Sequence, residues 1–167
     1  MEKEIRIKGL EPIVGEDPEI LILGTFPGES SRKANQYYFD NSNRFWGIVN
    51  RVLNDNQGFV SYAAKTKCLK EHHIALWDIY ETKLFTGESS NKGIKSPTFN
   101  NLGMFLSEHP SIRRIVFNGK SEPAYEIARI KYGIPRDMCV YLRQTSGSAC
   151  TKLVDYLESW GEALTQL

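Results

Sequence analysis

The segment from Glu19 to Ser31 reads EILILGTFPGESS, and it decides the fold class. An unbroken apolar run that ends in a turn of glycine and proline is typical of a short strand buried on both faces. Three other runs are of the same kind: Ile74 to Asp78 (IALWD), Ile112 to Asn118 (IRRIVFN) and Met138 to Leu142 (MCVYL). The sequence therefore predicts four short strands, the first of them Glu19 to Gly24.

Helical segments separate these strands. The clearest runs from Asn43 to Asn54, where apolar residues recur at spacings of three and four. Looser periodicity predicts helices over Ser61 to Glu71, Phe99 to Ser107, Ser121 to Tyr132 and Thr151 to Leu164. Strands that alternate with helices predict an α/β fold of three layers, α/β/α, with a central four-stranded, mainly parallel sheet. Because ligands of such sheets bind outside the carboxyl ends of the strands, we look for functional residues there.

Length and composition set further bounds. With 167 residues and 41% hydrophobic residues the chain can bury one sizeable core, so we expect residues 1–167 to form a single domain. The net charge of +1 means that any contact with nucleic acid must come from a local patch. No apolar run approaches the roughly 20 residues needed to cross a bilayer, so we expect no membrane contact.

The cysteines indicate a reducing compartment. Cys68, Cys139 and Cys150 are widely separated and form no Cys-x-x-Cys pair, which argues against a zinc ribbon or an iron–sulfur cluster. The first residues, MEKE, lack the apolar stretch of a signal peptide. We therefore expect a cytoplasmic protein with reduced thiols and no metal.

The loop after the first strand is the most unusual stretch of the chain. It begins at Gly24, passes two adjacent tyrosines, Tyr37 and Tyr38, and leads through Ser42 and Asn43 into the predicted helix. Loops of this length in compact domains are commonly reserved for binding or catalysis. The alternative is that glycine and proline only form turns and that Asn43 or Ser42 only caps the helix.

Polar residues also follow the other three strands. Asp78 ends the second strand, and Asn118-Gly119-Lys120 follows the third. The fourth leads into the small-residue loop RQTSGSA, from Arg143 to Ala149, whose backbone amides at a helix start would favour an anion such as a DNA phosphate. The alternative for each of these residues is an ordinary turn or helix cap.

Basic residues occur in every one of these loops. They could build one positive rim that faces a phosphate backbone, although surface loops commonly carry lysine in any case. They are Arg32, Lys33, Lys92, Lys95, Lys120, Arg143 and Lys152.

Taken in order, the segments GTFPGESS, YYFDNSNRFW, IALWD, IRRIVFNGK and YLRQTSGSA resemble the uracil-DNA glycosylase superfamily. Within it the chain looks like the hypoxanthine-DNA (deoxyinosine) glycosylase branch. The resemblance extends from Ile20 to about Thr151, and Gly24 to Trp46 is its most specific part. It implies a four-stranded parallel sheet with a pocket for an extruded base at the strand ends. It also implies damaged DNA as the partner and a monomeric protein.

The resemblance assigns residues to the base pocket. Many members have Asn or a carboxylate where this chain has Thr25 and Phe26, so the polar catalytic group is expected to be Asn43, which is similar to the Asn of an Asn-x-Phe-Trp segment. Asp78 lies where uracil-specific relatives read the base edge with Asn. The expected base-binding residues are Gly24, Thr25, Phe26, Pro27, Gly28, Tyr38, Asp78 and Asn118.

The loop Leu142 to Ala149 resembles the second motif, which pinches the DNA backbone in relatives. Here Arg143 and Gln144 replace the first two residues of the usual Pro-Ser-Thr-Ser pattern, and Cys150 falls near a common Asn. The expected DNA-binding residues are Arg143, Gln144, Thr145, Ser146, Gly147, Ser148 and Lys120.

The implied activity is that of a monofunctional DNA glycosylase, which hydrolyses the N-glycosidic bond of a flipped-out hypoxanthine or uracil in base excision repair. This chemistry needs no cofactor, because the protein extrudes the nucleotide, stabilises the separating charges and positions a water. Asn43 would orient that water, and Phe26 with Tyr37 or Tyr38 would stack on the base, unless Phe26 only packs in the core. Asn118 is a candidate reader of the base. Asp78 could accept from the ring N–H or stabilise the sugar cation.

Two alternatives remain open at this point. One is a weak or inactive glycosylase fold that binds DNA or a nucleobase. The other is a serine hydrolase or nucleotide-binding domain on the same sheet, although the chain lacks a Gly-x-Ser-x-Gly elbow and a Walker-type loop. In a hydrolase the nucleophile would be Ser30, Ser31 or Ser146, and the base His72, His73 or His109.

Overall fold

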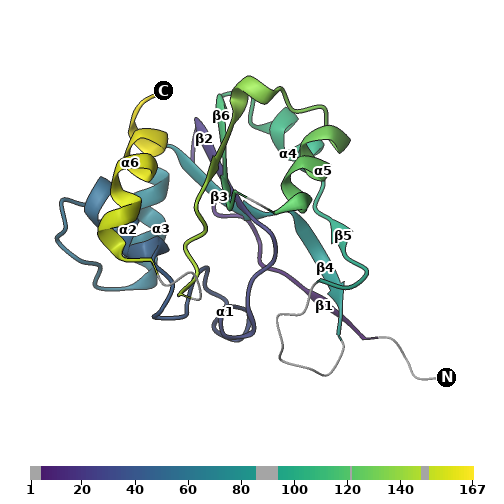
Figure 1. The fold of residues 1–167 in the computed structure, drawn as a ribbon, viewed down its shortest axis with the longest axis horizontal. Helices are drawn as coiled ribbons and strands as arrows, with labels where there is room; N and C mark the ends of the chain where they lie inside the picture. The colour runs from purple at the N-terminus through teal and green to yellow at the C-terminus, as the bar shows by residue number, and fades with distance from the viewer. Residues whose placement is uncertain (1–4, 86–93, 121, 148–150) are drawn as a thin grey trace.

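A four-stranded parallel sheet forms the centre of the fold in the computed structural model, which describes residues 5–85, 94–120, 122–147 and 151–167. Its strand order is β3-β2-β6-β7, and all three pairings are parallel. This confirms the predicted central sheet (Figure 1). The strands are β2 (Ile20–Gly24), β3 (Ile74–Asp78), β6 (Arg114–Asn118) and β7 (Cys139–Leu142).

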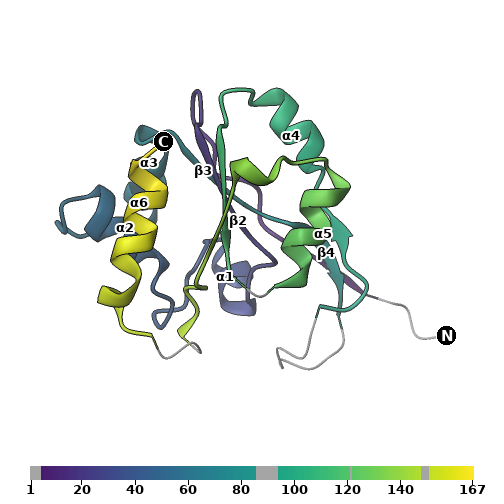
Figure 2. The same ribbon diagram turned by 45° about the horizontal axis from the view of Figure 1, so that its top comes forward.

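Helices cover both faces of this sheet. Successive residues of each strand point to opposite sides, so apolar side chains need cover on both faces. Ile20 and Ile22 pack in one core, whereas Leu21 and Leu23 pack in the other. Figures 1 and 2 show the two helical layers on opposite sides of the sheet. The first layer holds α2 (Phe45–Leu53), α3 (Tyr62–Glu71) and α6 (Leu157–Thr165), and the second holds α4 (Leu102–Glu108) and α5 (Pro123–Lys131). The predicted α/β/α layering is confirmed.

A second, antiparallel sheet was not predicted. It has the strand order β1-β4-β5 and consists of β1 (Arg6–Lys8), β4 (Tyr80–Leu84) and β5 (Thr98–Phe99). The prediction that a helix begins at Phe99 is wrong, because Phe99 pairs with Tyr80 in this sheet. The helix α4 begins at Leu102. The preceding residue, Asn101, caps it, because its side chain accepts a hydrogen bond from the Met104 amide.

Two other helical segments differ from the sequence prediction. A short helix, α1 (Glu29–Ala34), follows the first strand, where no apolar periodicity indicated one. The last helix begins later than predicted, since Leu153–Tyr156 forms a 3-10 turn before α6. The predicted start of α5 at Ser121 lies outside the described residues.

The small helix α1 occupies the edge of the molecule where the functional loops meet. In both ribbon views it lies between the chain that leads into α6 and the β1–β4 pair (Figures 1 and 2). Within the described residues, no helix has the length and apolar character needed to cross a membrane.

Candidate active site

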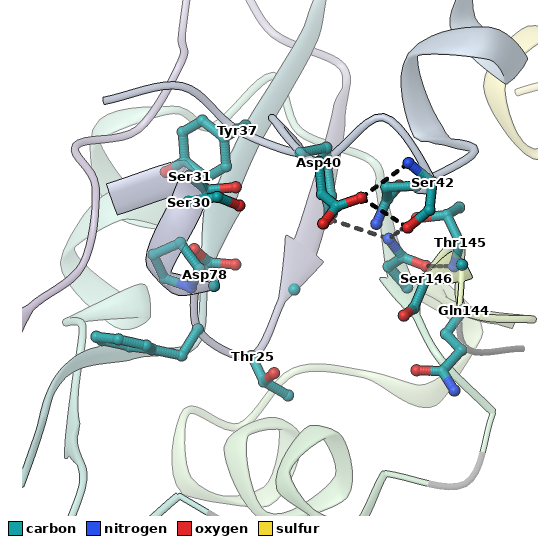
Figure 3. Close-up of a pocket in the computed structure, with 18 of the residues that line it drawn as sticks. Thr25, Ser30, Ser31, Tyr37, Asp40, Ser42, Asp78, Gln144, Thr145 and Ser146 are labelled. Carbon is teal, nitrogen blue, oxygen red and sulfur yellow. Dashed lines mark hydrogen bonds between the residues drawn. The ribbon is translucent and has the colours of Figure 1, made fainter. Parts of the chain in front are cut away.

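A cavity of about 440 Å³ opens at the carboxyl ends of the parallel strands. It has the size of a small-molecule site and is lined from the loop after β2, the ends of β3 and β6, and the loop after β7. Figure 3 shows Ser30, Ser31 and Asp78 on one side and Ser42 and Thr145 on the other. The expected site residues that line it are Gly24, Thr25, Phe26, Pro27, Gly28, Tyr38, Asn43, Asp78, Asn118, Gln144, Thr145, Ser146 and Gly147.

Gly24 makes room for two polar groups on one wall of this cavity. A Cβ at position 24 would lie 2.5 Å from Oδ1 of Asp78 and 3.2 Å from the hydroxyl oxygen of Tyr38. β2 and β3 place Gly24 and Asp78 side by side in register. Only a residue without a side chain therefore allows both groups to approach the backbone of β2.

Asp78 is a buried carboxyl group without a full set of partners. The residue is 5% exposed, and its Oδ2 atom is enclosed without a hydrogen-bond donor. Burial disfavours the charged form and raises the pKa of Asp78 to about 7. An unpaired buried acceptor that lines a cavity is typical of a ligand site, because a donor from the ligand would remove the penalty of burial.

Asn118 joins three segments around the cavity. Its side-chain NH₂ group donates to the Tyr38 hydroxyl and to Oγ1 of Thr145, both at 3.0 Å. Its Oδ1 accepts from the backbone amide of Thr145, also at 3.0 Å. Both amide hydrogens are therefore occupied, so a base could use only the second lone pair of Oδ1 unless one of these bonds opened.

Tyr38 forms a strained part of the wall. Its backbone has a φ of 52°, a left-handed conformation that costs a bulky residue about 1–3 kcal/mol. Its ring lies 4.3 Å from that of Phe45, with an interplanar angle of 32°. The contact to Phe45 and the hydrogen bond from Asn118 hold the side chain in this position.

Asn43 lies at the start of α2 and lines the cavity. Its Oδ1 accepts from the Phe45 backbone amide at 2.9 Å, so it also fixes the first turn of the helix. Beside it, the Asp40 carboxylate accepts from the backbone amide and the hydroxyl of Ser42, at 2.8 and 2.6 Å. A hydrogen bond to the first residue of α2 and a position in the cavity lining thus occur in the same residue.

Phe26 and Tyr37 have surroundings that were not predicted. Tyr37 is buried, and its hydroxyl donates to the Glu11 carbonyl at 2.8 Å. The Phe26 ring lies near two cations, with Lys83 Nζ 5.1 Å and Arg32 Cζ 6.0 Å from its centroid. Both residues line the cavity: Phe26 is partly exposed and packs against the second core, whereas Tyr37 is buried in the core beneath α2 and α3.

The expected DNA-binding residues surround two neighbouring cavities. Gln144 to Gly147 line the first, and Gly147 lies so close to Ser42 that a side chain there would collide with it. Lys120 and Arg143 line a second cavity of about 590 Å³, which shares Asn118 and Gln144 with the first. Ser148, Cys150 and the basic residue Lys92 lie outside the described residues.

Some lining residues were not predicted. Asp40 and Tyr125 carry no motif that would mark them, and only the fold brings them to the cavity. Tyr125 comes from α5, and its hydroxyl donates to the Asn118 carbonyl at 3.0 Å.

The hydrolase alternative finds no geometric support. His72, His73 and His109 are all described, and none of them lines the cavity with Ser30, Ser31 and Ser146. His73 and His109 precede β3 and β6, at the opposite ends of the strands. Among the described residues, no group of three His, Cys, Asp or Glu side chains could hold a metal ion.

The fold is that of the uracil-DNA glycosylase class. The solution NMR structure of a candidate uracil DNA glycosylase from Methanosarcina acetivorans superposes with a TM-score of 0.79 and 27% sequence identity. The match covers 96% of this chain and 97% of that chain. No family model matches the sequence.

Two curated relatives narrow the assignment. A protein named hypoxanthine DNA glycosylase from Methanosarcina acetivorans is 33% identical over 119 residues, which are 71% of this chain and 75% of the relative. One of the same name from Methanosarcina barkeri is 29% identical over 156 residues, 93% of this chain and 96% of the relative. The chain belongs to the hypoxanthine DNA glycosylase branch of the uracil-DNA glycosylase superfamily.

Replacement of Gly24 by alanine is expected to destabilise the site. The new Cβ would press on Asp78, and overpacking of this kind costs about 1–3 kcal/mol. Urea unfolding followed by circular dichroism measures the loss. The matched control is Gly28→Ala, whose Cβ would meet nothing within 4 Å. Equal stability of the two variants would contradict the close approach at Gly24.

The buried carboxyl of Asp78 predicts a specific pH dependence of stability. Its pKa is about 7 in the folded protein and 3.8 ordinarily, so between these values the folded state holds a proton that the unfolded chain has released. The free energy of unfolding should therefore fall as the pH rises from about 4 to about 7. Asp78→Asn should remove this contribution.

Urea titrations at pH 5 and pH 8 test this prediction. The stability difference between wild type and Asp78→Asn should change between these two pH values. Asp40→Asn is the control, because hydrogen bonds from Ser42 lower the pKa of Asp40 and keep it ionised throughout this range. A difference for Asp78→Asn that stays constant would show that the carboxyl titrates normally.

Proposed function

We propose that this protein is a monofunctional DNA glycosylase that hydrolyses the N-glycosidic bond of a deaminated base, hypoxanthine above all, flipped out of damaged DNA. The observation that carries the proposal is the unpaired, buried carboxyl of Asp78 in a cavity at the strand ends. The curated relatives named hypoxanthine DNA glycosylase support the same reaction. The product, an abasic site, would enter base excision repair.

Asp78 is proposed to read the base edge. Hypoxanthine presents a ring N–H donor, which the enclosed Oδ2 atom can accept when the carboxyl is ionised. Adenine presents a ring nitrogen acceptor at the same place, so the ionised carboxylate would stay unpaired and would face a lone pair. Rejection through an unpaired buried group is the stronger form of discrimination. Uracil also offers a ring N–H, so this contact alone admits both lactam bases.

Tyr38 is proposed to stack on the flipped base. Its strained backbone and its contacts with Phe45 and Asn118 hold the ring at the cavity wall. A preplaced aromatic ring contributes about 1–3 kcal/mol per stacked base. Asn118 then acts mainly by positioning Tyr38 and Thr145. Phe26 also lines the cavity, from the turn after β2.

Asn43 is proposed to orient the attacking water. Its Oδ1 already accepts from the Phe45 amide, which fixes the side chain, and the second lone pair can accept from a water hydrogen. As the bond to the base breaks, positive charge develops on the sugar and negative charge on the base. The base leaves as an anion with the electron pair of the broken bond, and the water oxygen bonds to the sugar carbon and gives up a proton, which the departed base anion takes up. A weakly basic amide suffices because the sugar cation is a strong electrophile.

The loop after β7 is proposed to bind the DNA backbone. Thr145 is fully buried and anchors the loop, whereas Arg143 and Gln144 are exposed at the mouths of the two cavities. Lys120 adds a positive charge beside them. Such contacts fix the register of the strand and do not read its sequence. We propose that the protein acts as a monomer without metal or cofactor.

Duplexes that contain deoxyinosine or uracil test the proposed activity. Wild type should release the free base and leave alkali-labile sites, at a higher rate for deoxyinosine. Asn43→Ser keeps an oxygen that can cap α2 but is too short to hold the water, so the single-turnover rate should fall by about 100-fold or more.

The matched control is Asn41→Ala, in the same loop but outside the cavity lining. It should cleave like wild type. Unchanged cleavage by a folded Asn43→Ser variant would remove Asn43 from its role. A wild-type protein that binds these duplexes without releasing any base would overturn the proposed enzyme.

A further inference from the structure

Two cationic side chains approach the ring of Phe26 without an acidic partner. Lys83 belongs to β4 of the small antiparallel sheet, and Arg32 belongs to α1. Their charged groups lie 5.1 Å and 6.0 Å from the ring centroid. Within the part of the chain that the structure describes, neither forms an ion pair with a carboxylate.

Their surroundings are unfavourable for cations in the absence of an anion. The Nε–H of Arg32 is enclosed and meets no acceptor. Burial and the nearby Arg32 charge lower the pKa of Lys83. Glu29, the acid on α1, forms its ion pair with Lys33 at 2.7 Å, and Arg32 acts on it only as the weakest of the charges and hydrogen bonds that lower its pKa. The two like charges repel each other, as the effect of Arg32 on the pKa of Lys83 indicates, and a bound anion would relieve this repulsion.

The pair lies next to the base cavity. Phe26 lines that cavity, and its ring contacts both cations. The helix α1 lies between the chain after β7 and the β1–β4 pair (Figures 1 and 2). A DNA strand with one nucleotide in the cavity and its backbone on the Gln144 to Gly147 loop would therefore reach α1 and β4 on the other side.

We propose that Arg32 and Lys83 together bind one backbone phosphate of the DNA strand that carries the flipped nucleotide. The small antiparallel sheet is then part of the DNA interface, and the strand is held on both sides of the cavity. This inference rests on the proposed function, since it requires a DNA ligand.

The salt dependence of binding to an undamaged duplex tests the proposal without any cleavage. Fluorescence anisotropy gives the association constant at several salt concentrations. Neutralising one phosphate contact lowers the magnitude of the slope of log K against log salt by about 0.9. We expect this decrease for the double variant Arg32→Met and Lys83→Met, together with weaker binding. A decrease near twice that value would indicate two separate phosphates and contradict a shared one.

Lys65→Met is the matched control. Lys65 lies over the ring of Trp46 at 5.6 Å, in the same kind of contact, but on α3. It should leave the slope unchanged. Methionine retains the aliphatic contact with the aromatic ring in each variant, and thermal unfolding confirms that the variants fold. An unchanged slope in the folded double variant would overturn the proposal.

Neutral methylphosphonate linkages locate the phosphate. Placed singly around deoxyinosine, one such linkage should weaken wild-type binding and have no further effect on the double variant. Equal sensitivity of both proteins at every position would contradict a local contact. The single-turnover rate at saturating protein should stay within about twofold of wild type, because neither residue touches the reacting atoms. If wild type released no base but the salt slope still decreased in the double variant, the proposed activity would be contradicted and the proposed phosphate contact would be supported.

Discussion

The side-chain amide of Asn118 holds the candidate site together. Its three hydrogen bonds tie the end of β6 to Tyr38, 80 residues earlier in the chain, and to Thr145, 27 residues later. The loops after β2 and β7 thereby face each other across the cavity. Gly24 completes this arrangement, because the missing side chain lets Tyr38 and Asp78 approach β2.

The hydrogen bonds of Asn118 stabilise the site, whereas the burial of the Asp78 carboxyl opposes the stability of the fold. Its Oδ2 is enclosed without a donor, and burial raises its pKa to about 7. Asn118 with its satisfied amide gives the cavity its shape, whereas the unsatisfied carboxyl is the group that we propose binds a donor. The unpaired cations beside Phe26 follow the same principle, with the charge reversed. At Asp78 a ligand would supply the missing hydrogen-bond donor, and beside Phe26 it would supply the missing negative charge.

The central sheet could be predicted because each of its strands is a short apolar run. The alternation of strands with helices indicated that the strands are parallel. Thirteen of the expected site residues line the cavity because parallel strands end at one edge. The second sheet could not be predicted, since Arg6–Lys8 and Thr98–Phe99 are too short to show a pattern. The roles of Asn118, Arg32 and Lys83 depend on contacts between distant parts of the chain, which no local motif records.

The central claim is that a lactam base occupies the cavity with its ring N–H on Asp78. A crystal structure with a duplex that contains a non-cleavable 2′-fluoro deoxyinosine would test it most directly. The account predicts the flipped hypoxanthine against Tyr38, with its ring nitrogen at hydrogen-bond distance from the Asp78 carboxyl. A base that remained stacked in the duplex, or that entered the cavity and left Asp78 unpaired, would contradict the account.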